Sequence, residues 1–394
     1  MKSHPIFYAF AFVSGMLSYS CSNSSNDVTP IEMQSAITQT FGAKIDLTNL
    51  DNYENQPIPN YIRKDNTANN AISNGGASLG RVLFYDKNLS SNNTISCASC
   101  HKQAFAFSDE AQVSNGVNGV TDRHAMRLVN SRFANEGRFF WDERAATLEA
   151  QTTQPIQNHA EMGFSGANGD GDINTLIAKL QAIAYYQELF TFVYDDATIT
   201  EVRMQNAMAQ FVRSIQSFDS KFDMGRAQVN NDNDPFPNFS TQENLGKQLF
   251  ITPPQFNNNG LRTSGGVGCA GCHQAPEFDI DPNSHNNGTI GTASGMGNDL
   301  IVTRAPSLRD VVKADGTSNG PFMHIGVSNN FMTVLNHYDQ INLAGNNNLD
   351  QRLIPGGNPQ NLAMTQNEKD ALVAFIKTLA GTDVYINSKW SDPF

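Results

Sequence analysis

Two short stretches decide the fold: SCASCH at residues 96–101 and GCAGCH at residues 268–273. Each is a C-x-x-C-H motif, in which two thiols form thioethers with a haem and the adjacent histidine coordinates the iron. The residues are Cys97, Cys100 and His101 in the first motif and Cys269, Cys272 and His273 in the second. The sequence therefore predicts two covalently bound haem c groups.

Two other uses of a C-x-x-C pair fit this chain less well. A zinc site built from both pairs would leave about 170 residues between them, and it would not explain the histidine after each second cysteine. Thioredoxin-like chemistry needs the motif at a strand-to-helix turn of a β-α-β unit, and no such alternation surrounds either motif. Two copies in one chain favour haem attachment.

Similar segments precede the two motifs, LGRVLFYD at residues 79–86 and LGKQLFIT at residues 245–252, so the chain repeats itself. Helices are expected after the capping pairs Thr198 with Glu201, Ser240 with Glu243 and Thr365 with Glu368, and over residues 173–192. Alternating strand patterns are scarce. The predicted fold class is mainly α, with two tandem cytochrome c-like haem domains and long loops.

The length of 394 residues predicts more than one domain, and the Asn-, Asp- and Pro-rich stretch 230–237 marks a boundary. We expect a signal peptide over residues 1–21, an N-terminal extension over 22–75, one haem domain over 76–235 and a second haem domain over 236–394.

The N-terminus is typical of an exported protein. Lys2 precedes an apolar run at residues 6–17 that is too short to span a bilayer. Cys21 follows, the one cysteine outside the haem motifs, and we expect it to carry a lipid anchor. Because Leu17 lies one position further from Cys21 than usual, simple cleavage stays an alternative. The expected location is the periplasm or the outer membrane.

The charge of the chain bears on its partners. The net charge of −12 argues against nucleic acid as a partner and favours a basic protein. Only 16% of the residues are charged and 39% are hydrophobic, so uncharged polar residues are abundant. That composition indicates a globular protein with long polar loops.

Two further stretches, FFWDERAATLEAQTTQPIQNHAEM at 139–162 and APSLRDV at 305–311, complete an ordered pattern with the haem motifs. In this combination residues 79–381 resemble the bacterial di-haem cytochrome c peroxidases and their MauG relatives. The resemblance implies reduction of hydrogen peroxide to water at the N-terminal haem. Electrons would come from a small cytochrome c or a cupredoxin and enter at the C-terminal haem. Residues 76–235 would then be the peroxidatic haem domain and residues 236–394 the electron-transfer haem domain. A homodimer and a monomer both stay open.

The resemblance assigns roles to three residues. Gln151 and Glu161 match the distal residues that bind and deprotonate peroxide, and a carboxylate within reach of peroxide can move its proton. Trp141 matches the tryptophan that relays electrons between the haems. Without the family, these residues would be interpreted as surface polar groups and a buried aromatic side chain.

The chain departs from the family at the peroxidatic haem. Many members hold a removable distal histidine, and the matching stretch SNGVNGV at 114–120 has none. An open coordination position is therefore expected, without reductive activation. His124 is the nearby alternative ligand, but it stands where relatives have an asparagine near a calcium ion.

A second departure concerns the C-terminal haem. The position fourteen residues after His324, where classical members have a methionine ligand, is Tyr338, as in the MauG branch. A phenolate favours Fe(III) and lowers the reduction potential, whereas a thioether raises it. Other ligands stay open: Met296, Met323, Met332 and His337.

The resemblance also implies one calcium ion, held between the domains by the backbone at Asn319 and Pro321. Two alternative functions remain. The first is a MauG-like oxidase that uses peroxide to oxidise a protein or organic substrate, favoured by Tyr338 and the missing histidine. The second is a multihaem electron carrier, which would have no use for Gln151 and Glu161.

Overall fold

The computed structural model describes residue 1 and residues 35–394, apart from residues 136, 281, 327 and 344. Residues 35–394 form one compact unit. The expected signal peptide and Cys21 lie outside the described residues. No helix within the described part of the chain has the length and apolar character that a membrane span requires.

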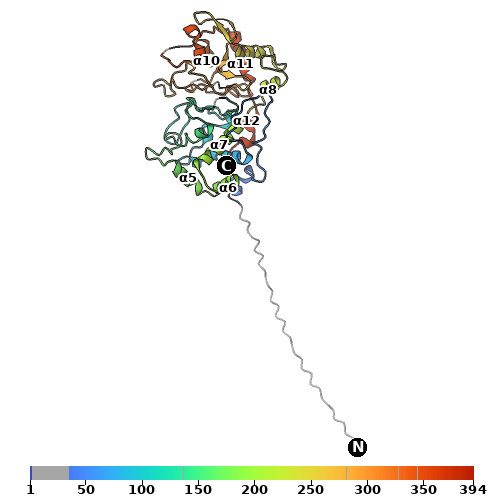
Figure 1. The fold of residues 1–394 in the computed structure, drawn as a ribbon, viewed down its shortest axis with the longest axis vertical. Helices are drawn as coiled ribbons and strands as arrows, with labels where there is room; N and C mark the ends of the chain where they lie inside the picture. Colours follow the sequence, from blue (N-terminus) through green and yellow to red (C-terminus); the bar gives the residue numbers. More distant parts are fainter. Residues whose placement is uncertain (2–34, 136, 281, 327, 344) are drawn as a thin grey trace. The chain divides into compact units, whose positions relative to one another are not determined.

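Helices dominate the regular structure of the described residues, and the only strands there form two short pairs (Figure 1). The helices are α1 (Ala36–Phe41), α2 (Asn74–Tyr85), α3 (Cys97–Cys100), α4 (Leu148–Thr152), α5 (Ile173–Gln181), α6 (Ala184–Tyr194), α7 (Glu201–Ser214), α8 (Lys221–Arg226), α9 (Thr241–Ile251), α10 (Phe331–Asp339), α11 (Gln366–Lys377) and α12 (Asp383–Ile386). Strand β1 (Pro254–Phe256) pairs antiparallel with β2 (Arg262–Gly265), and β3 (His273–Gln274) with β4 (Asp279–Ile280). The predicted mainly α class is confirmed.

Two helix pairs organise the chain: α2 packs along α7, and α9 packs along α11. Each pair is closest at a glycine. A Cβ atom at Gly80 would collide with the carbonyl oxygen of Ala207, and one at Gly246 with the carbonyl oxygen of Ala371. Gly80 and Gly246 hold the same position in the repeated LG segments, so the sequence repeat is also a repeat of helix packing.

The capping signals are confirmed at two of three helices. Ser240 with Glu243 begins α9, and Thr365 with Glu368 begins α11, each as a complete capping box. The expected cap at Thr198 is wrong. Thr200 caps α7 through the Arg203 N–H, and Thr198 lies in a turn because its N–H donates to the Asp196 carboxylate.

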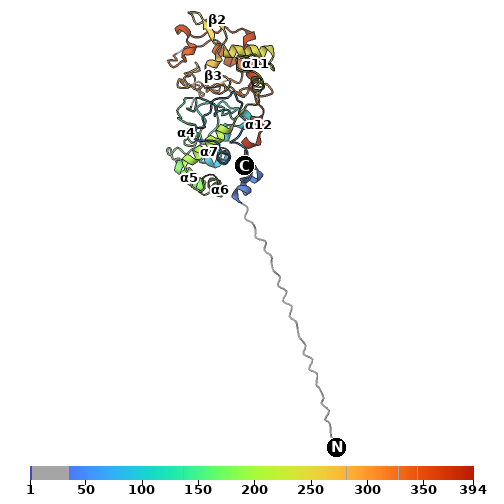
Figure 2. The ribbon, with the colours of Figure 1, turned by 45° about the vertical axis from the view of Figure 1, so that its right-hand side comes forward.

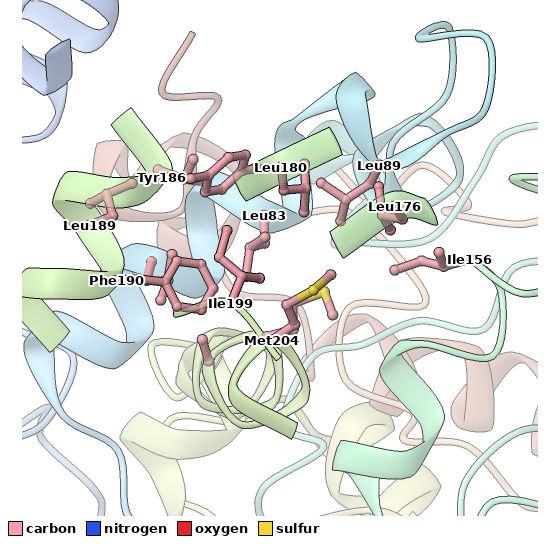
Figure 3. Close-up of a cluster of buried hydrophobic side chains, with 14 of the residues drawn as sticks. Leu83, Leu89, Ile156, Leu176, Leu180, Tyr186, Leu189, Phe190, Ile199 and Met204 are labelled. Carbon is pink, nitrogen blue, oxygen red and sulfur yellow. The ribbon is translucent and has the colours of Figure 1, made fainter. Parts of the chain in front are cut away.

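The helical stretch expected over residues 173–192 is two helices, α5 and α6. The chain becomes extended at Ile183, with φ −95° and ψ 120°, which ends the first helix and begins the second. The break lets both helices pack against one buried cluster. Figure 3 shows Leu180 of α5 and Phe190 of α6 in that cluster with Leu83 of α2 and Met204 of α7.

The structure has two groups of buried clusters. The N-terminal core surrounds α2, α5, α6 and α7. The C-terminal core surrounds α8, α9 and α11, and aromatic rings dominate it, such as Phe222, Phe250 and Phe375. Each core therefore contains one of the two helix pairs.

The last residues of the chain return to the N-terminal core. Trp390 is buried there, and its Nε1 donates to the Ser214 hydroxyl of α7 at 3.3 Å. Arg81 of α2 donates to the Ser391 carbonyl oxygen at 2.7 Å, and the Tyr85 hydroxyl to the Trp390 carbonyl oxygen. Figure 2 shows α12, coloured red, beside α7. Residues 382–394 thus pack with the N-terminal core although they follow the C-terminal one.

We expect Gly80→Ala and Gly246→Ala each to destabilise the fold by about 1–3 kcal/mol, because the added methyl group would force the paired helix backbones apart. Thermal or denaturant unfolding of the haem-loaded protein measures the effect. Gly137→Ala is the matched control, since a Cβ atom there has no neighbour within 4 Å. Equal stability of all three variants would show that the helix crossing does not need glycine.

Candidate functional site

The first C-x-x-C-H motif lies on the short helix α3, which Ser96 and Ser99 cap reciprocally. His101 follows, and its Nδ1 lies 3.0 Å from the carbonyl oxygen of Phe107. A carbonyl only accepts, so Nδ1 carries the proton and Nε2 keeps a lone pair for a metal. Burial lowers the pKa of His101, which favours this neutral form.

The second motif has the same residue types as the first but a different local backbone structure. Cys269 begins a 3-10 turn, Cys269–Gly271, and His273 opens β3. The His273 Nδ1 lies 3.0 Å from the carbonyl oxygen of Pro306, and burial lowers the pKa of His273 to about 4. Both histidines are therefore held with the proton on Nδ1, so that the Nε2 lone pair can ligate a haem iron.

Each motif borders a cavity of a size that suits a cofactor. The first cavity, of about 730 Å³, is lined by Cys100, His101, Gln151 and Glu161 among others. The second, of about 620 Å³, is lined by Cys269, Cys272, His273, Met323 and Tyr338 among others. The donor set of each motif, two thiols and one histidine, fits covalently attached haem. Cys100 and His101 lie in the wall of the first cavity, and Cys269, Cys272 and His273 lie in the wall of the second.

The structure places Gln151 and Glu161 in the wall of the first cavity. Gln151 comes from α4, and Glu161 from the turn that follows it. Burial raises the pKa of Glu161 to about 7, partly offset by Arg144, while Asp122 adds to the rise. A carboxyl group with this pKa can accept and release a proton near neutral pH.

The loop without a histidine packs directly on this turn. Val117 N–H donates to the Glu161 carbonyl oxygen at 2.9 Å, and Asn118 N–H to the Ala160 carbonyl oxygen at 3.2 Å. A Cβ atom at Gly116 would collide with the Ala160 carbonyl oxygen. The loop 114–120 therefore supports the backbone of Glu161.

Trp141 lines both cavities. Its Nε1 donates to the His124 carbonyl oxygen at 2.8 Å, and its carbonyl oxygen accepts the N–H groups of Thr303 and Arg304. Its ring meets His324 edge-on, with ring centroids 6.2 Å apart. The side chain is fixed between the two cavities by residues from both parts of the chain.

The structure narrows the ligand candidates at the second cavity. Tyr338 and Met323 are among the described lining residues, whereas Met296, Met332 and His337 lie outside that lining, and Met296 is 78% exposed. Asn287 donates through Nδ2 to the Tyr338 hydroxyl at 2.9 Å and to the Met323 sulfur at 3.5 Å. Both candidate ligands therefore accept a hydrogen bond from the side-chain amide of Asn287. Sequence reasoning missed Asn287.

The calcium prediction finds no support. The Asn319 carbonyl oxygen, an expected ligand, accepts a hydrogen bond from Arg127 Nη2 at 2.6 Å. His124 is buried, with Nδ1 3.0 Å from the Ala111 carbonyl oxygen and Nε2 3.2 Å from the Ser108 hydroxyl. Pro321 follows a cis peptide bond at Gly320. No cluster of three His, Cys, Asp or Glu that could hold a metal occurs among the described residues.

Sequence reasoning missed Arg127, which lines both cavities. The one available signal was a charged residue inside the mostly apolar run AMRLV at residues 125–129. An isolated arginine of this kind cannot be told from a surface residue until its surroundings are known.

Comparison with known proteins agrees with this chemistry. Residues 74–231 match the family model of di-haem cytochrome c peroxidase. The methylamine utilization protein MauG of Methylophilus methylotrophus is 29% identical over 77% of this chain and 82% of its own length. The cytochrome c551 peroxidase of Nitrosomonas europaea is 28% identical over 77% and 80%.

A solved structure of a MauG-like protein associated with microbial copper homeostasis is 26% identical, with a TM-score of 0.65 over 86% of this chain and 99% of that chain. A variant of the diheme peroxidase BthA from Burkholderia thailandensis shares the fold, with a TM-score of 0.61 at 20% identity over 86% and 94%. Residues 74–231 thus match the di-haem cytochrome c peroxidase family, and most of the chain is similar to MauG and to cytochrome c peroxidases.

Proposed function

We propose that the protein reduces hydrogen peroxide to water, taking two electrons from a small cytochrome c or cupredoxin and two protons. The observation that carries the proposal is Glu161, a partly buried carboxyl group in the same cavity as His101 and Gln151. A pure electron carrier gains nothing from such a group, since its buried charge costs stability without a proton to move.

The chain's own residues divide the work. His101 and His273 would each ligate a haem c through Nε2, and the bound haem would supply redox-active iron. The Gln151 amide can hold peroxide by hydrogen bonds. Glu161 can take the proton from one peroxide oxygen and deliver it to the other. Trp141, in the wall of both cavities, shortens the path for electrons between them.

The tandem arrangement is part of this proposal, with the peroxide-reacting haem in residues 76–235 and the electron-entry haem in 236–394. Each motif accompanies its own helix pair and core, which supports the division. Residues 382–394 complete the N-terminal core. We also propose export to the periplasm, with Cys21 as a lipid anchor.

A MauG-like oxidase of a protein or organic substrate is the second candidate. It is favoured by Tyr338 in the wall of the second cavity, because a phenolate ligand would lower the reduction potential and hinder electron entry from a donor. The oxidation of a reduced donor after mixing with peroxide and the enzyme distinguishes the peroxidase from the oxidase. Rapid donor oxidation supports the peroxidase; a reaction with peroxide that leaves the donor reduced supports the oxidase.

Haem content tests the two attachment sites. We expect Cys97→Ala with Cys100→Ala to leave one covalent haem per chain, and Cys269→Ala with Cys272→Ala to do the same, because thioether bonds need the thiols. Mass spectrometry and haem staining after denaturing electrophoresis measure this. Ser99→Ala, inside the first motif, should retain two haems. Full haem content in either cysteine variant would contradict the assignment.

The proton-transfer role of Glu161 predicts a pH dependence. A base must be deprotonated, and the pKa of Glu161 is raised to about 7, so peroxide turnover should fall as the pH drops below about 7. Glu161→Gln keeps the shape and removes the base, so we expect turnover to fall by about 10²–10⁴-fold and this pH limb to disappear.

The measurement is steady-state peroxide turnover across the neutral range, with the spectrum recorded to confirm intact haem. Glu110→Gln is the matched control, since Glu110 is half-exposed, pairs with Lys102 near the first motif and lies outside the described lining of the cavity. Full turnover by Glu161→Gln would remove the residue from the mechanism.

A matched pair of variants identifies the ligand at the second cavity. We expect Tyr338→Phe, which removes only the hydroxyl, to raise the reduction potential of the C-terminal haem and change its visible spectrum, because an anionic oxygen ligand favours Fe(III). Met323→Leu should leave both unchanged. Potentiometric titration followed by visible absorbance measures this. If only Met323→Leu changes the spectrum, the thioether is the ligand.

A further inference from the structure

Arg127 holds an unusual place between the two cavities. It lines both of them, and its Nη2 donates to the Asn319 carbonyl oxygen at 2.6 Å. Arg127 lies in the segment that follows the first haem motif, whereas Asn319 belongs to the chain after the second. The guanidinium thus connects the two parts of the chain from a position in the walls of both cavities.

The positive charge of Arg127 lacks a paired anion. Among the described residues no carboxylate forms an ion pair with it, and its buried Nε has no hydrogen-bond partner. Asp310 and Tyr385 act on it only at a distance, and burial lowers its pKa. By contrast, the buried guanidinium of Arg309 pairs with Asp223 at 2.7 Å, and Arg213 pairs with Glu149.

Arg127 is partly buried, and withdrawing a guanidinium from water is costly unless hydrogen bonds or a partner of opposite charge offset the loss. The cofactor that the two cavities fit carries carboxylates itself, since each haem has two propionate groups. Arginine binds carboxylates through hydrogen bonds from its guanidinium N–H groups, and the Nε–H of Arg127 has no partner among the described residues.

The hydrogen bond from Arg127 to Asn319 also explains why the residues expected to bind calcium do not fit the ion. The Asn319 carbonyl expected to bind the ion is engaged by Arg127, and the ring nitrogens of His124, which replaces the expected asparagine, lie against Ala111 and Ser108. A cation is still present at this place, but it is a side chain.

We propose that Arg127 takes the place of the calcium ion: its guanidinium holds the Asn319 carbonyl on one side and binds a haem propionate on the other. The proposal rests on haem binding in the cavities and not on peroxide turnover. The quantities measured in its tests are therefore the reduction potentials of the haems and the metal content of the protein. A failure of the peroxidase proposal would leave it standing.

The first test removes the charge. We expect Arg127→Gln, which can still donate to Asn319, to lower the reduction potential of at least one haem, because a nearby positive charge favours Fe(II). Arg127→Lys should keep potentials close to those of the native protein. Potentiometric titration of the di-haem protein measures each haem. Arg203→Gln is the matched control, since it removes the same charge from an ion pair with Asp196 outside the described cavity linings.

The second test addresses calcium directly. We expect the desalted native protein to contain no stoichiometric calcium by atomic emission, and its potentials to stay unchanged after treatment with EGTA. Calcium that EGTA removes with a shift in potential would overturn the proposal. So would unchanged potentials in Arg127→Gln. If that variant loses haem, Arg127→Lys decides: loss of haem or shifted potentials there too would contradict a role of charge.

Discussion

The close contact of two helix backbones, made once in each core, is the constraint on which the rest of the structure depends. The carbonyl oxygens of Ala207 and Ala371 fill the space where a side chain at Gly80 or Gly246 would lie. Helices α2 and α9 are thereby fixed against α7 and α11. Each haem motif follows the first helix of its pair, so the glycine contacts fix the helices that lead into the two motifs.

Once the helix pairs are set, the two cavities differ mainly on the side away from the motif histidine. Both histidines donate through Nδ1 to a backbone carbonyl, so their chemistry toward a metal is the same. The first cavity adds a carboxyl group whose pKa is raised to about 7, and the second adds a tyrosine and a methionine that share one amide donor. The two cavities can therefore differ in function although both follow the same arrangement of helix pair and motif histidine.

The features that could be predicted from the sequence are those whose residues lie close together in the chain. The haem motifs and the capping boxes at Ser240 and Thr365 are complete within a few residues, and the two capping boxes are confirmed. The cap at Thr198 failed because a competing carboxylate two residues earlier, Asp196, binds its N–H. The return of Trp390 to the N-terminal core joins residues 176 positions apart, and no pattern in the sequence announces it.

The site shows the same difference between contacts of residues close in sequence and contacts of residues far apart. The structure brings Gln151 and Glu161 to one cavity, as the family resemblance implied, because both lie in one short helix and its following turn. Calcium was expected from Asn319 and Pro321, but the contact that occupies the Asn319 carbonyl comes from Arg127, 192 positions earlier in the chain. A ligand set carried over from a family holds only while its neighbours are unchanged. Here one arginine supplies the positive charge at that place, and the same side chain reaches the linings of both cavities.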